Sequence, residues 1–309
     1  MTQGGGVDVS VVIVTYNSAR DVGDALKSAY AAGAEAGLGL EVIVVDNASS
    51  DGTLDAIATG FPSARVIANK ENVGFGRANN QAFEVAAGRH VLLLNPDARL
   101  DRGALGELVA RISKLAAGGV APSIGDRGAE SCGMAPGIRS MIGHFLFVNR
   151  LLVGDTGGAW RGFQLARRRG SSPRHVEWAS AAVLLLDTTA IQAVGGFDPS
   201  FFMYGEDVDL GMRLTHAGRP LWLVPSARAT HSIAASQGGV STRWVDSLRA
   251  LYARQHRGVR LLVFDAVVAV GLALRAGATS ARAGGRGDVH ARRMRAAASR
   301  SVELLFRRN

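Results

Sequence analysis

Short apolar segments and helical segments alternate through roughly the first hundred residues of the chain. Four segments rich in Val, Ile and Leu are predicted to be buried strands: Val9–Tyr16, Glu41–Asp46, Ala64–Asn69 and His90–Asp97. The helical segments between and after them begin at Ser18 or Asp21 and run to Tyr30, begin after Ser49–Thr53, and cover Gly76–Ala87 and Arg102–Leu115. Continuous apolar strands separated by helices predict an α/β fold with a mainly parallel sheet covered on both faces.

Each predicted strand ends in a polar turn: Thr15-Tyr16-Asn17, Asp46-Asn47, Asn69–Asn72 and Asn95-Pro96-Asp97. Ligands of such sheets bind beyond the carboxyl ends of the strands. We therefore expect the turns to form a binding site and the strands to be its scaffold.

The second part of the chain is less regular. Residues Gly118–Pro173 are glycine-rich, contain the basic cluster Arg167-Arg168-Arg169, and are expected to form in part a mobile loop. Three elements are predicted after it: a strand at Val176–Asp187, a helix at Glu206–Ala217, and a short strand at Leu221–Pro225 that ends near His231. We find no internal repeat.

The positive charge of the chain is concentrated at its end. The net charge is +9, and the residues from Ser241 onward contain 14 arginines, no lysine and four acids, so that this segment alone carries +10. Helices are predicted here. The longest apolar stretch, Leu261–Leu274, has 14 residues with Asp265 inside it. A bilayer span needs about 20 apolar residues, so this stretch is expected to be buried or to lie on a membrane surface.

Two features concern the compartment. Cys132 is the lone cysteine, which excludes an internal disulfide and a metal site built from several cysteines, and fits a reducing cytosol. Residues Met1–Ser10 lack a basic start followed by a long apolar run, so no signal peptide is expected.

Two carboxylates follow buried strands, and each has two interpretations. The segment that begins at Asp46 could simply cap the following helix through Asn47, Ser49 or Asp51, or the Asp46 carboxylate could accept hydrogen bonds from a base or ribose at the edge of the sheet. Asp97 could belong to a Pro-Asp type I turn, or bind a divalent cation, since Mg²⁺ and Mn²⁺ prefer oxygen ligands.

Three further motifs are candidates for chemistry. Gly205–Arg213 places three acids at the start of a helix behind the aromatic run Phe201–Tyr204, more acids than capping needs, and an apolar wall would raise the pKa of a carboxylate toward that of a general base. His231 is either structural or a second ligand of the cation beside Asp97. Glu71–Asn80 resembles a glycine-rich phosphate loop without the G-x-G-x-x-G spacing.

Together these segments resemble the family 2 inverting glycosyltransferases of GT-A fold. Among them the chain is most similar to bacterial rhamnosyltransferases that act on a polyprenyl-diphosphate-linked sugar. The resemblance covers roughly Val9–Ser236. It rests on VVIVTYNS, VVDNASSDGT, NVGFGRANNQA, LLLNPDA, VEWASAAVLLL, GGFDPSFFMYGEDVDLGMR and the later His231.

The resemblance implies a role for each motif residue. Asp207 matches the catalytic base, with Glu206 beside it. Asn95-Pro96-Asp97 occupies the metal-binding D-x-D position with its first Asp replaced by Asn, so that Asp97 and His231 would contact Mg²⁺ or Mn²⁺. Trp178 falls in the acceptor region. The residues implied to bind the nucleotide sugar are Thr15, Asn17, Asp46, Asn47, Asn72, Gly74, Arg77, Asn79 and Asn95.

The implied enzyme has two regions. Residues 1–240 would form the glycosyltransferase domain, with a nucleotide-sugar half at about 1–117 and an acceptor half at about 118–240. Residues 241–309 would form a basic helical region that attaches to an anionic membrane surface, at the inner face of the plasma membrane, rather than a solvated helical bundle or a nucleic-acid-binding tail. The expected donor is dTDP-rhamnose and the expected acceptor a polyprenyl-diphosphate-linked N-acetylglucosamine.

Three alternatives remain at this point: a transferase of the same family for galactofuranose, glucose or N-acetylglucosamine, a non-catalytic nucleotide-sugar-binding protein, and a dinucleotide-binding oxidoreductase. The last is disfavoured because no G-x-G-x-x-G follows the first strand.

Overall fold

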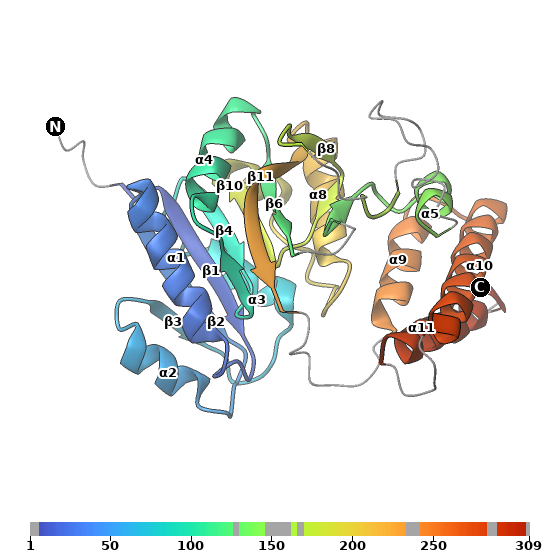
Figure 1. The fold of residues 1–309 in the computed structure, drawn as a ribbon, viewed down its shortest axis with the longest axis horizontal. Coiled ribbons are helices and arrows are strands. Elements are labelled where there is room, and N and C mark those ends of the chain that lie inside the picture. The colour runs from blue at the N-terminus through green and yellow to red at the C-terminus, as the bar shows by residue number, and fades with distance from the viewer. Residues whose placement is uncertain are drawn as a thin grey trace. The chain divides into compact units, whose positions relative to one another are not determined.

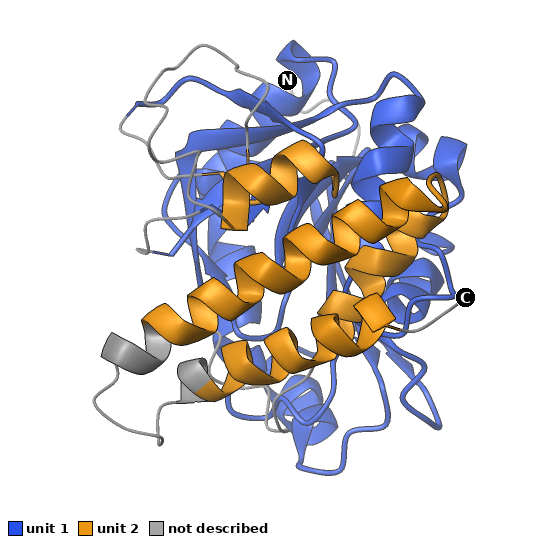
Figure 2. Cartoon of the chain, turned by 90° about the vertical axis from the view of Figure 1, so that its right-hand side faces the viewer, with its two compact units in different colours: residues 1–132, 167–235 blue, residues 133–166, 236–309 orange. Residues whose placement is uncertain are grey.

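The computed structural model describes residues 6–125, 130–145, 162–165, 170–232, 242–282 and 289–306. The chain divides into two compact units, and Figure 2 colours them separately. Unit 1 comprises residues 1–132 and 167–235, and unit 2 comprises residues 133–166 and 236–309. Segment 133–166, which is part of the predicted acceptor half, therefore belongs to the same compact unit as the C-terminal helices. The functional boundaries near 117 and 240 stay predictions, and the basic cluster 167–169 lies outside the described residues.

Unit 1 contains the predicted sheet. Its strands are β1 (Val9–Thr15), β2 (Leu40–Asp46), β3 (Arg65–Ala68), β4 (His90–Leu94), β5 (Ala98–Leu100), β6 (Gly119–Ile124), β8 (Arg174–Val176), β9 (Trp178–Ala179), β10 (Val183–Asp187) and β11 (Leu221–His231). Its helices are α1 (Val22–Ala36), α2 (Thr53–Gly60), α3 (Phe75–Phe83), α4 (Ala104–Lys114), α7 (Thr188–Val194) and α8 (Glu206–His216). Strand β7 (Cys132–Gly133) lies at the boundary of the units.

Among the described residues, nine strands form one mixed sheet. Its order is β3-β2-β1-β4-β10-β6-β11-β5, and β8 also pairs with β11. Strands β1 to β4 are parallel, β10 runs antiparallel to both β4 and β6, and β6 is parallel to β11. The carboxyl ends of β1, β2, β4, β6 and β11 therefore meet the amino end of β10 at one edge. This is the edge at which the sequence predicted a ligand site.

Both faces of the sheet are buried, which explains the continuous apolar strands. On one face, residues such as Val11 and Val44 pack in one core with Leu26 of α1 and Leu108 of α4. Figure 1 shows these two helices on the same side of the sheet. Neighbouring strand residues that point the other way, such as Val12 and Ile43, are also buried.

The structure differs from the sequence prediction in four places. A buried strand, β6, and helix α5 (Ile138–Phe145) lie within the segment expected to be irregular. The strand predicted at Val176–Asp187 is divided into the last residue of β8, strand β9 and strand β10, with breaks at Glu177 and at residues 180–182. The strand predicted over His90–Asp97 stops at Leu94, because Asn95-Pro96-Asp97 forms a turn closed by the Ala98 N–H on the Asn95 carbonyl at 3.0 Å. Strand β11 continues to His231 through an irregularity between Val224 and Arg228.

Unit 2 is helical in its described residues, as predicted for the chain after 241. Besides α5 it contains α9 (Arg243–Ala253), α10 (Val259–Arg282) and α11 (Val289–Phe306). Figure 2 shows α5 and α11 on either side of α10. One apolar core joins the four helices, with residues such as Phe145, Leu248, Phe264 and Leu304. Within the described residues, α10 alone has the length and apolar composition that would permit a membrane crossing, and close to half of it is buried in the unit.

Candidate active site

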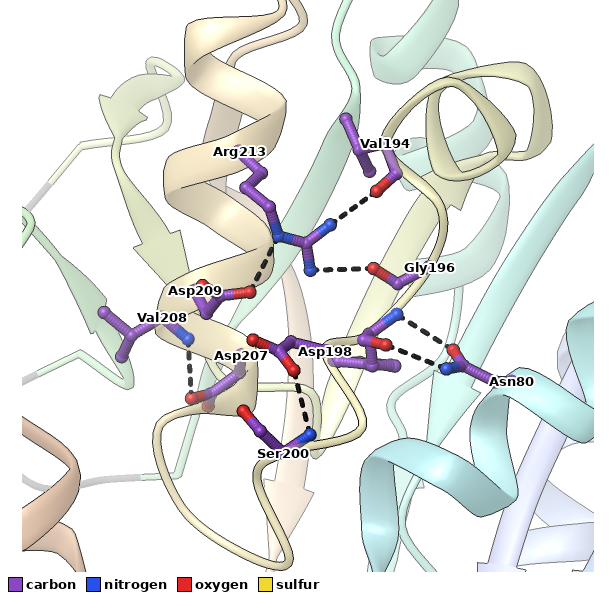
Figure 3. Close-up of polar contacts among 10 residues, drawn as sticks. Asn80, Val194, Gly196, Asp198, Ser200, Asp207, Val208, Asp209 and Arg213 are labelled. Carbon is purple, nitrogen blue, oxygen red and sulfur yellow. Dashed lines mark hydrogen bonds and ion pairs between the residues drawn. The ribbon is translucent and has the colours of Figure 1, made fainter. Parts of the chain in front are cut away.

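Helix α8 begins with three acidic residues, and the structure gives each a different environment. Asp209 is buried and its carboxylate forms an ion pair with Arg213 at 2.7 Å (Figure 3). The guanidinium of Arg213 also donates to two backbone carbonyls of the turn after α7, at 2.7 Å each. Asp209 therefore helps to fix α8 in the unit, and the other two acids, Glu206 and Asp207, are left as candidates for chemistry.

Asp207 is half-buried at the amino end of α8. Its carboxylate accepts hydrogen bonds from the backbone N–H of Val208, at 2.8 Å, and from that of Ala181. Burial raises the pKa of Asp207 to about 6, although these hydrogen bonds act to lower it. A carboxylate with a pKa just below neutral is mostly ionised at about pH 7 and still basic enough to take a proton in a transition state.

Glu206 differs from the other two acids because one of its carboxylate oxygens is buried without a hydrogen bond in the described part of the chain. It is buried, and its Oε2 atom has no hydrogen-bond partner among the described residues. Burial, and next the negative charge of Asp207, raise the pKa of Glu206 to about 8. An unpartnered buried carboxylate is costly as an anion, so burial favours the protonated form of Glu206 more strongly than that of Asp207.

Close packing fixes the position of α8. A Cβ atom added at Gly211 would lie 2.4 Å from the carbonyl oxygen of Glu177, directly before β9. Only glycine permits this approach of helix and strand. The turn that enters α8 is also constrained, because Tyr204 has a φ of 70° and Gly205 a φ of 94°. A non-glycine residue with positive φ is uncommon and is often found at functional sites.

A second polar cluster lies at the same edge of the sheet. The Asp97 Oδ1 atom is 3.0 Å from the His231 Nε2 atom, and the Asn95 amide nitrogen is 3.3 Å from the same Nε2. Strand β11 brings His231 here, because it pairs antiparallel with β5 so that His231 is opposite Ala98. The structure therefore brings together three predicted residues from two distant segments of the sequence, Asn95-Pro96-Asp97 and His231.

The donor set of this cluster fits a divalent cation. In octahedral coordination at about 2.1 Å, neighbouring ligand atoms are about 3 Å apart, which matches the 3.0 Å between Asp97 Oδ1 and His231 Nε2. Two protein ligands leave further positions for oxygens of a diphosphate. No group of three or more His, Cys, Asp or Glu side chains that could hold a metal by itself occurs in the described part of the chain. The site is thus suited to a cation that the substrate helps to bind.

The turn between β9 and β10 connects the two clusters. The N–H of Ala181 donates to Asp207, and the carbonyl of the next residue, Ala182, accepts the N–H of Asn95 at 2.8 Å. The carboxylate at α8 and the Asp97–His231 pair are therefore on either side of one dipeptide. The sequence analysis did not single out this dipeptide, and the small residues Ala-Ser-Ala-Ala at 179–182 were the only local signal of a turn in an otherwise bulky apolar run.

The carboxylate of Asp46 is directed into the protein. Asp46 is fully buried, and it accepts hydrogen bonds from the hydroxyls of Thr15 at 2.7 Å and Ser49 at 2.5 Å and from the Ser49 N–H at 2.9 Å. In this structure Asp46 and Thr15 join the ends of β1 and β2 and fix the turn after β2. Of the residues considered for capping, Asp51 accepts the N–H of Thr53, the first residue of α2, at 3.1 Å. Direct contact of the Asp46 and Thr15 side chains with a nucleotide stays a prediction.

Two other predicted residues of this region differ in exposure. Asn17 is exposed, with a φ of 51°, and its side-chain oxygen accepts the N–H of Ser50 at 2.9 Å. Asn47 is buried, and its side-chain oxygen accepts from the amide of Asn69 at 2.9 Å. The neighbouring Tyr16, which the sequence analysis did not select, is more than half exposed at the end of β1. Tyr16 and Asn17 are thus the accessible groups of the first turn.

The segment from Asn72 to Asn79, which comprises a turn and the first part of α3, is held largely by its own contacts. The Asn72 side chain accepts the N–H of Gly74 at 3.0 Å, and the buried Asn79 amide donates to the Phe75 carbonyl at 2.9 Å. Arg77 Nε donates to a carbonyl of the segment before α8, that of Pro199, at 3.0 Å. Arg77 and Asn79 therefore have structural contacts here, and a contact of either with a diphosphate stays a prediction.

Gly74 and Trp178 also have defined positions. A Cβ atom at Gly74, whose φ is 90°, would lie 2.6 Å from the Phe202 carbonyl oxygen, so glycine allows the loop before α3 to touch the loop before α8. Trp178 is buried in β9, and its proposed contact with an acceptor is not tested by the geometry. Exposed Phe202 and Met203 were noted in the sequence only as an aromatic wall.

Comparisons with known proteins identify the class of this protein. The family described as glycosyl transferase family 2 matches residues 10–171, about half of the chain. The chain belongs to this family and is a glycosyltransferase. The matched range contains the turns after β1, β2 and β4 and ends before α8 and His231.

Two relatives have related names. The chain is 33% identical over 219 residues to the N-acetylglucosaminyl-diphospho-decaprenol L-rhamnosyltransferase of Mycobacterium tuberculosis, which covers 64% of this chain and 68% of that protein. It is 41% identical over 56 residues to the rhamnosyltransferase WbbL of Escherichia coli, 18% of this chain and 21% of that protein.

Solved structures agree on the fold. The structure of GalNAc-T7 with UDP, GalNAc and Mn²⁺ superposes with a TM-score of 0.61 at 16% identity, over 81% of this chain and about half, 48%, of that one. The mannosyltransferase PcManGT from Pyrobaculum calidifontis, with GDP-Man and Mn²⁺, gives a TM-score of 0.56 at 19% identity, over 97% and 81% of the two chains. The mixed sheet is therefore the GT-A-type fold expected from the sequence.

Proposed function

We propose that this protein is a metal-dependent, inverting L-rhamnosyltransferase. The donor would be dTDP-rhamnose and the acceptor a polyprenyl-diphosphate-linked N-acetylglucosamine, in the synthesis of a cell wall or surface polysaccharide. The substrate classes are supported by the name of the relative that is 33% identical. The observation that supports this reaction is that two clusters lie on either side of the Ala181–Ala182 dipeptide. One holds Asp207, a carboxylate with a raised pKa, and the other holds Asp97 and His231, which could bind a cation.

Asp207 is the proposed general base. A hydroxyl is a poor nucleophile near neutral pH, so the acceptor oxygen must lose its proton to the Asp207 carboxylate as it attacks the anomeric carbon. The bond from that carbon to the diphosphate breaks in the same step, and its electron pair leaves with the diphosphate. A single displacement inverts the anomeric centre. The burial that raises the pKa of Asp207 gives it the basicity required.

Glu206 is proposed to keep its proton during this step. A second negative charge beside Asp207 would raise the basicity further but would also cost free energy in a buried position without hydrogen bonds. A neutral Glu206 thus leaves one charge at the helix end, where the helix dipole favours an anion.

Asp97 and His231 are the proposed protein ligands of Mg²⁺ or Mn²⁺, with Asn95 beside them. The cation would neutralise charge that develops on the leaving diphosphate without a proton transfer. On the protein side, Asn95 is held by its N–H to Ala182, so its position follows the turn that also holds Asp207. The accessible Tyr16 and Asn17 are proposed to face the nucleotide.

The test is a panel of donors with one acceptor. Purified full-length protein is incubated with a short-chain N-acetylglucosaminyl-diphospho-lipid, Mg²⁺ or Mn²⁺, and dTDP-rhamnose, UDP-galactofuranose, UDP-glucose or UDP-N-acetylglucosamine. We expect a rhamnosylated product, of inverted anomeric configuration by NMR, that is lost with EDTA. Transfer from another donor would assign the alternative hexose, and retention of configuration would contradict the role of Asp207.

We also propose that the enzyme works at the inner face of the plasma membrane, where a polyprenyl-diphosphate acceptor with its reacting sugar on the cytoplasmic side would be located. The basic helices of unit 2 support attachment to anionic lipid.

A further inference from the structure

Helix α10 has one exposed face that is apolar along its length. Val259, Leu262, Val263, Val270 and Leu274 are each between 40% and 76% exposed. Their spacing of three, four or seven residues places them on one side of the helix. Smaller side chains fill the gaps on the same side, and they are Ala266, Ala273 and Gly277. From Val259 to Gly277 this face is about 27 Å long at 1.5 Å per residue. We call it the α10 face.

The opposite side of α10 is committed to unit 2. Phe264, Val268 and Leu272 pack in the core with α5, α9 and α11. Asp265 is buried and forms an ion pair with Arg249 of α9 at 3.0 Å. A helix that crossed a bilayer within this packing would have to take its neighbours and this ion pair with it. The structure thus fits a helix that lies along a surface rather than one that crosses a bilayer. Helix α10 has 24 residues and so extends beyond the 14-residue apolar stretch seen in the sequence.

The charges around the α10 face have one sign. Arg260 is the one exposed charged residue of α10 in the part whose side chains are described, residues 259–278, and exposed Arg257 lies two residues before the helix. The three acids described in unit 2, Asp246, Asp265 and Glu303, all form ion pairs with Arg249 or Arg300. The described residues of the unit therefore contain more arginines than acids.

An apolar helix face with exposed arginines at its amino end, on a unit with more arginines than acids, matches the surface of an anionic bilayer, with apolar side chains among the acyl chains and guanidinium groups at the phosphates. A second copy of the chain fits less well, because pairing two α10 faces would also bring two sets of arginines together. We propose that the α10 face lies in the interface of an anionic lipid membrane, parallel to its plane, and holds the enzyme there. The purpose of this contact, to bring the enzyme to a lipid-linked acceptor, rests on the proposed function. The contact with the membrane does not depend on that function.

The first test is co-sedimentation of the full-length protein with vesicles of phosphatidylcholine alone or with about one third phosphatidylglycerol. The variant V270E/L274E adds two charges to the α10 face, and A250E/S299E adds the same charges at exposed positions of α9 and α11. We expect V270E/L274E to need at least about tenfold more anionic lipid for half-maximal binding, and the control to bind nearly as the wild type. Equal binding by the two variants, or no binding by the wild type, would overturn the proposal.

A second test measures depth. Cys132 is buried and burial raises the pKa of its thiol, so a thiol-reactive dye is directed to an introduced cysteine. Dye at L274C should shift to the blue on anionic vesicles and be shielded from an aqueous quencher, whereas dye at A250C should not. No shift at either site contradicts insertion.

Two controls separate this inference from other outcomes. A wild-type dimer in lipid-free solution that V270E/L274E converts to a monomer would make the face an interface between copies of the chain, and would refute the membrane proposal. Transfer of rhamnose to the short-chain acceptor should be unchanged in V270E/L274E, since the altered residues are outside the proposed site. Absence of transfer in the wild type would refute the proposed function, while the vesicle result would still decide the role of the α10 face.

Discussion

The replacement of Asp207 by Asn tests the proposed reaction most directly, because it removes one charge and changes little in size. General-base catalysis supplies about 10²–10⁴-fold, so the rate of transfer should fall by that factor. Binding of the donor should change little, because the Asp97–His231 pair is held by other contacts. In the wild type the rate should rise through about pH 6 as Asp207 ionises.

The same replacement should stabilise the fold. Burial raises the pKa of Asp207 from an ordinary 3.8 to about 6, and one unit corresponds to about 1.4 kcal/mol. With allowance for its partial exposure, we expect D207N to gain on the order of 1–3 kcal/mol at about pH 7. Ionisation is less favourable in the folded state, so the wild type loses stability from about pH 4 to about pH 6. The advantage of D207N should therefore vanish below about pH 4.

Three measurements check this reasoning: single-turnover transfer, titration of the donor by calorimetry, and urea unfolding at both ends of the pH range. Full activity of D207N would refute the assignment of the base. A loss of activity with an equal loss of donor binding, or a lower stability at neutral pH, would instead indicate that Asp207 is a structural residue. D209N is the informative contrast, since loss of its ion pair with Arg213 should destabilise the protein.

Three further predictions follow from the site. The variants Asp97→Ala and His231→Ala should raise the Mg²⁺ or Mn²⁺ concentration that gives half-maximal activity by about tenfold or more. This concentration is measured by titrating the metal into EDTA-treated enzyme, and an unchanged value would exclude these two residues as ligands. At pH 7 the activity of Glu206→Gln should be within about tenfold of that of the wild type, since Glu206 is expected to be neutral below about pH 8. Any decline in the activity of the wild type above about pH 8 should be absent from this variant. Gly211→Val should destabilise the protein by about 1–3 kcal/mol because its side chain meets backbone, whereas Gly23→Ala in α1, which meets nothing within 4 Å, should not lower the melting temperature.

The first half of the fold was predictable because the local sequence pattern of each segment agrees with the strand or helix that it forms. The apolar runs that became β1, β2 and β4 are continuous, and their helices follow at short distances. Strand β6 was missed because Gly119, Pro122 and Ser123 dilute its apolar pattern, and only its place between β10 and β11 buries it. The break between β9 and β10 had only the small residues at 179–182 as a local signal, because the hydrogen bonds of this turn go to residues distant in sequence, Asp207 and Asn95.

The site was predictable in its residue types and less so in their environments. The sequence brought forward Asp97, His231 and Asp207, and the structure puts the first two 3.0 Å apart. It could not reveal that the carboxylate of Asp46 is enclosed by Thr15 and Ser49, because a polar turn after a strand has the same sequence whether its side chains point inward or outward.

The dipeptide at residues 181–182 contacts both the proposed base and a residue beside the proposed cation ligands through main-chain atoms alone. Its two side chains are methyl groups, and its N–H and carbonyl reach Asp207 and Asn95 respectively. We therefore expect substitutions in the surrounding loops to alter which sugar or alcohol fits without moving the proposed base and the proposed metal ligands relative to each other. An insertion of a single residue in this turn, in contrast, is expected to change the separation of these groups.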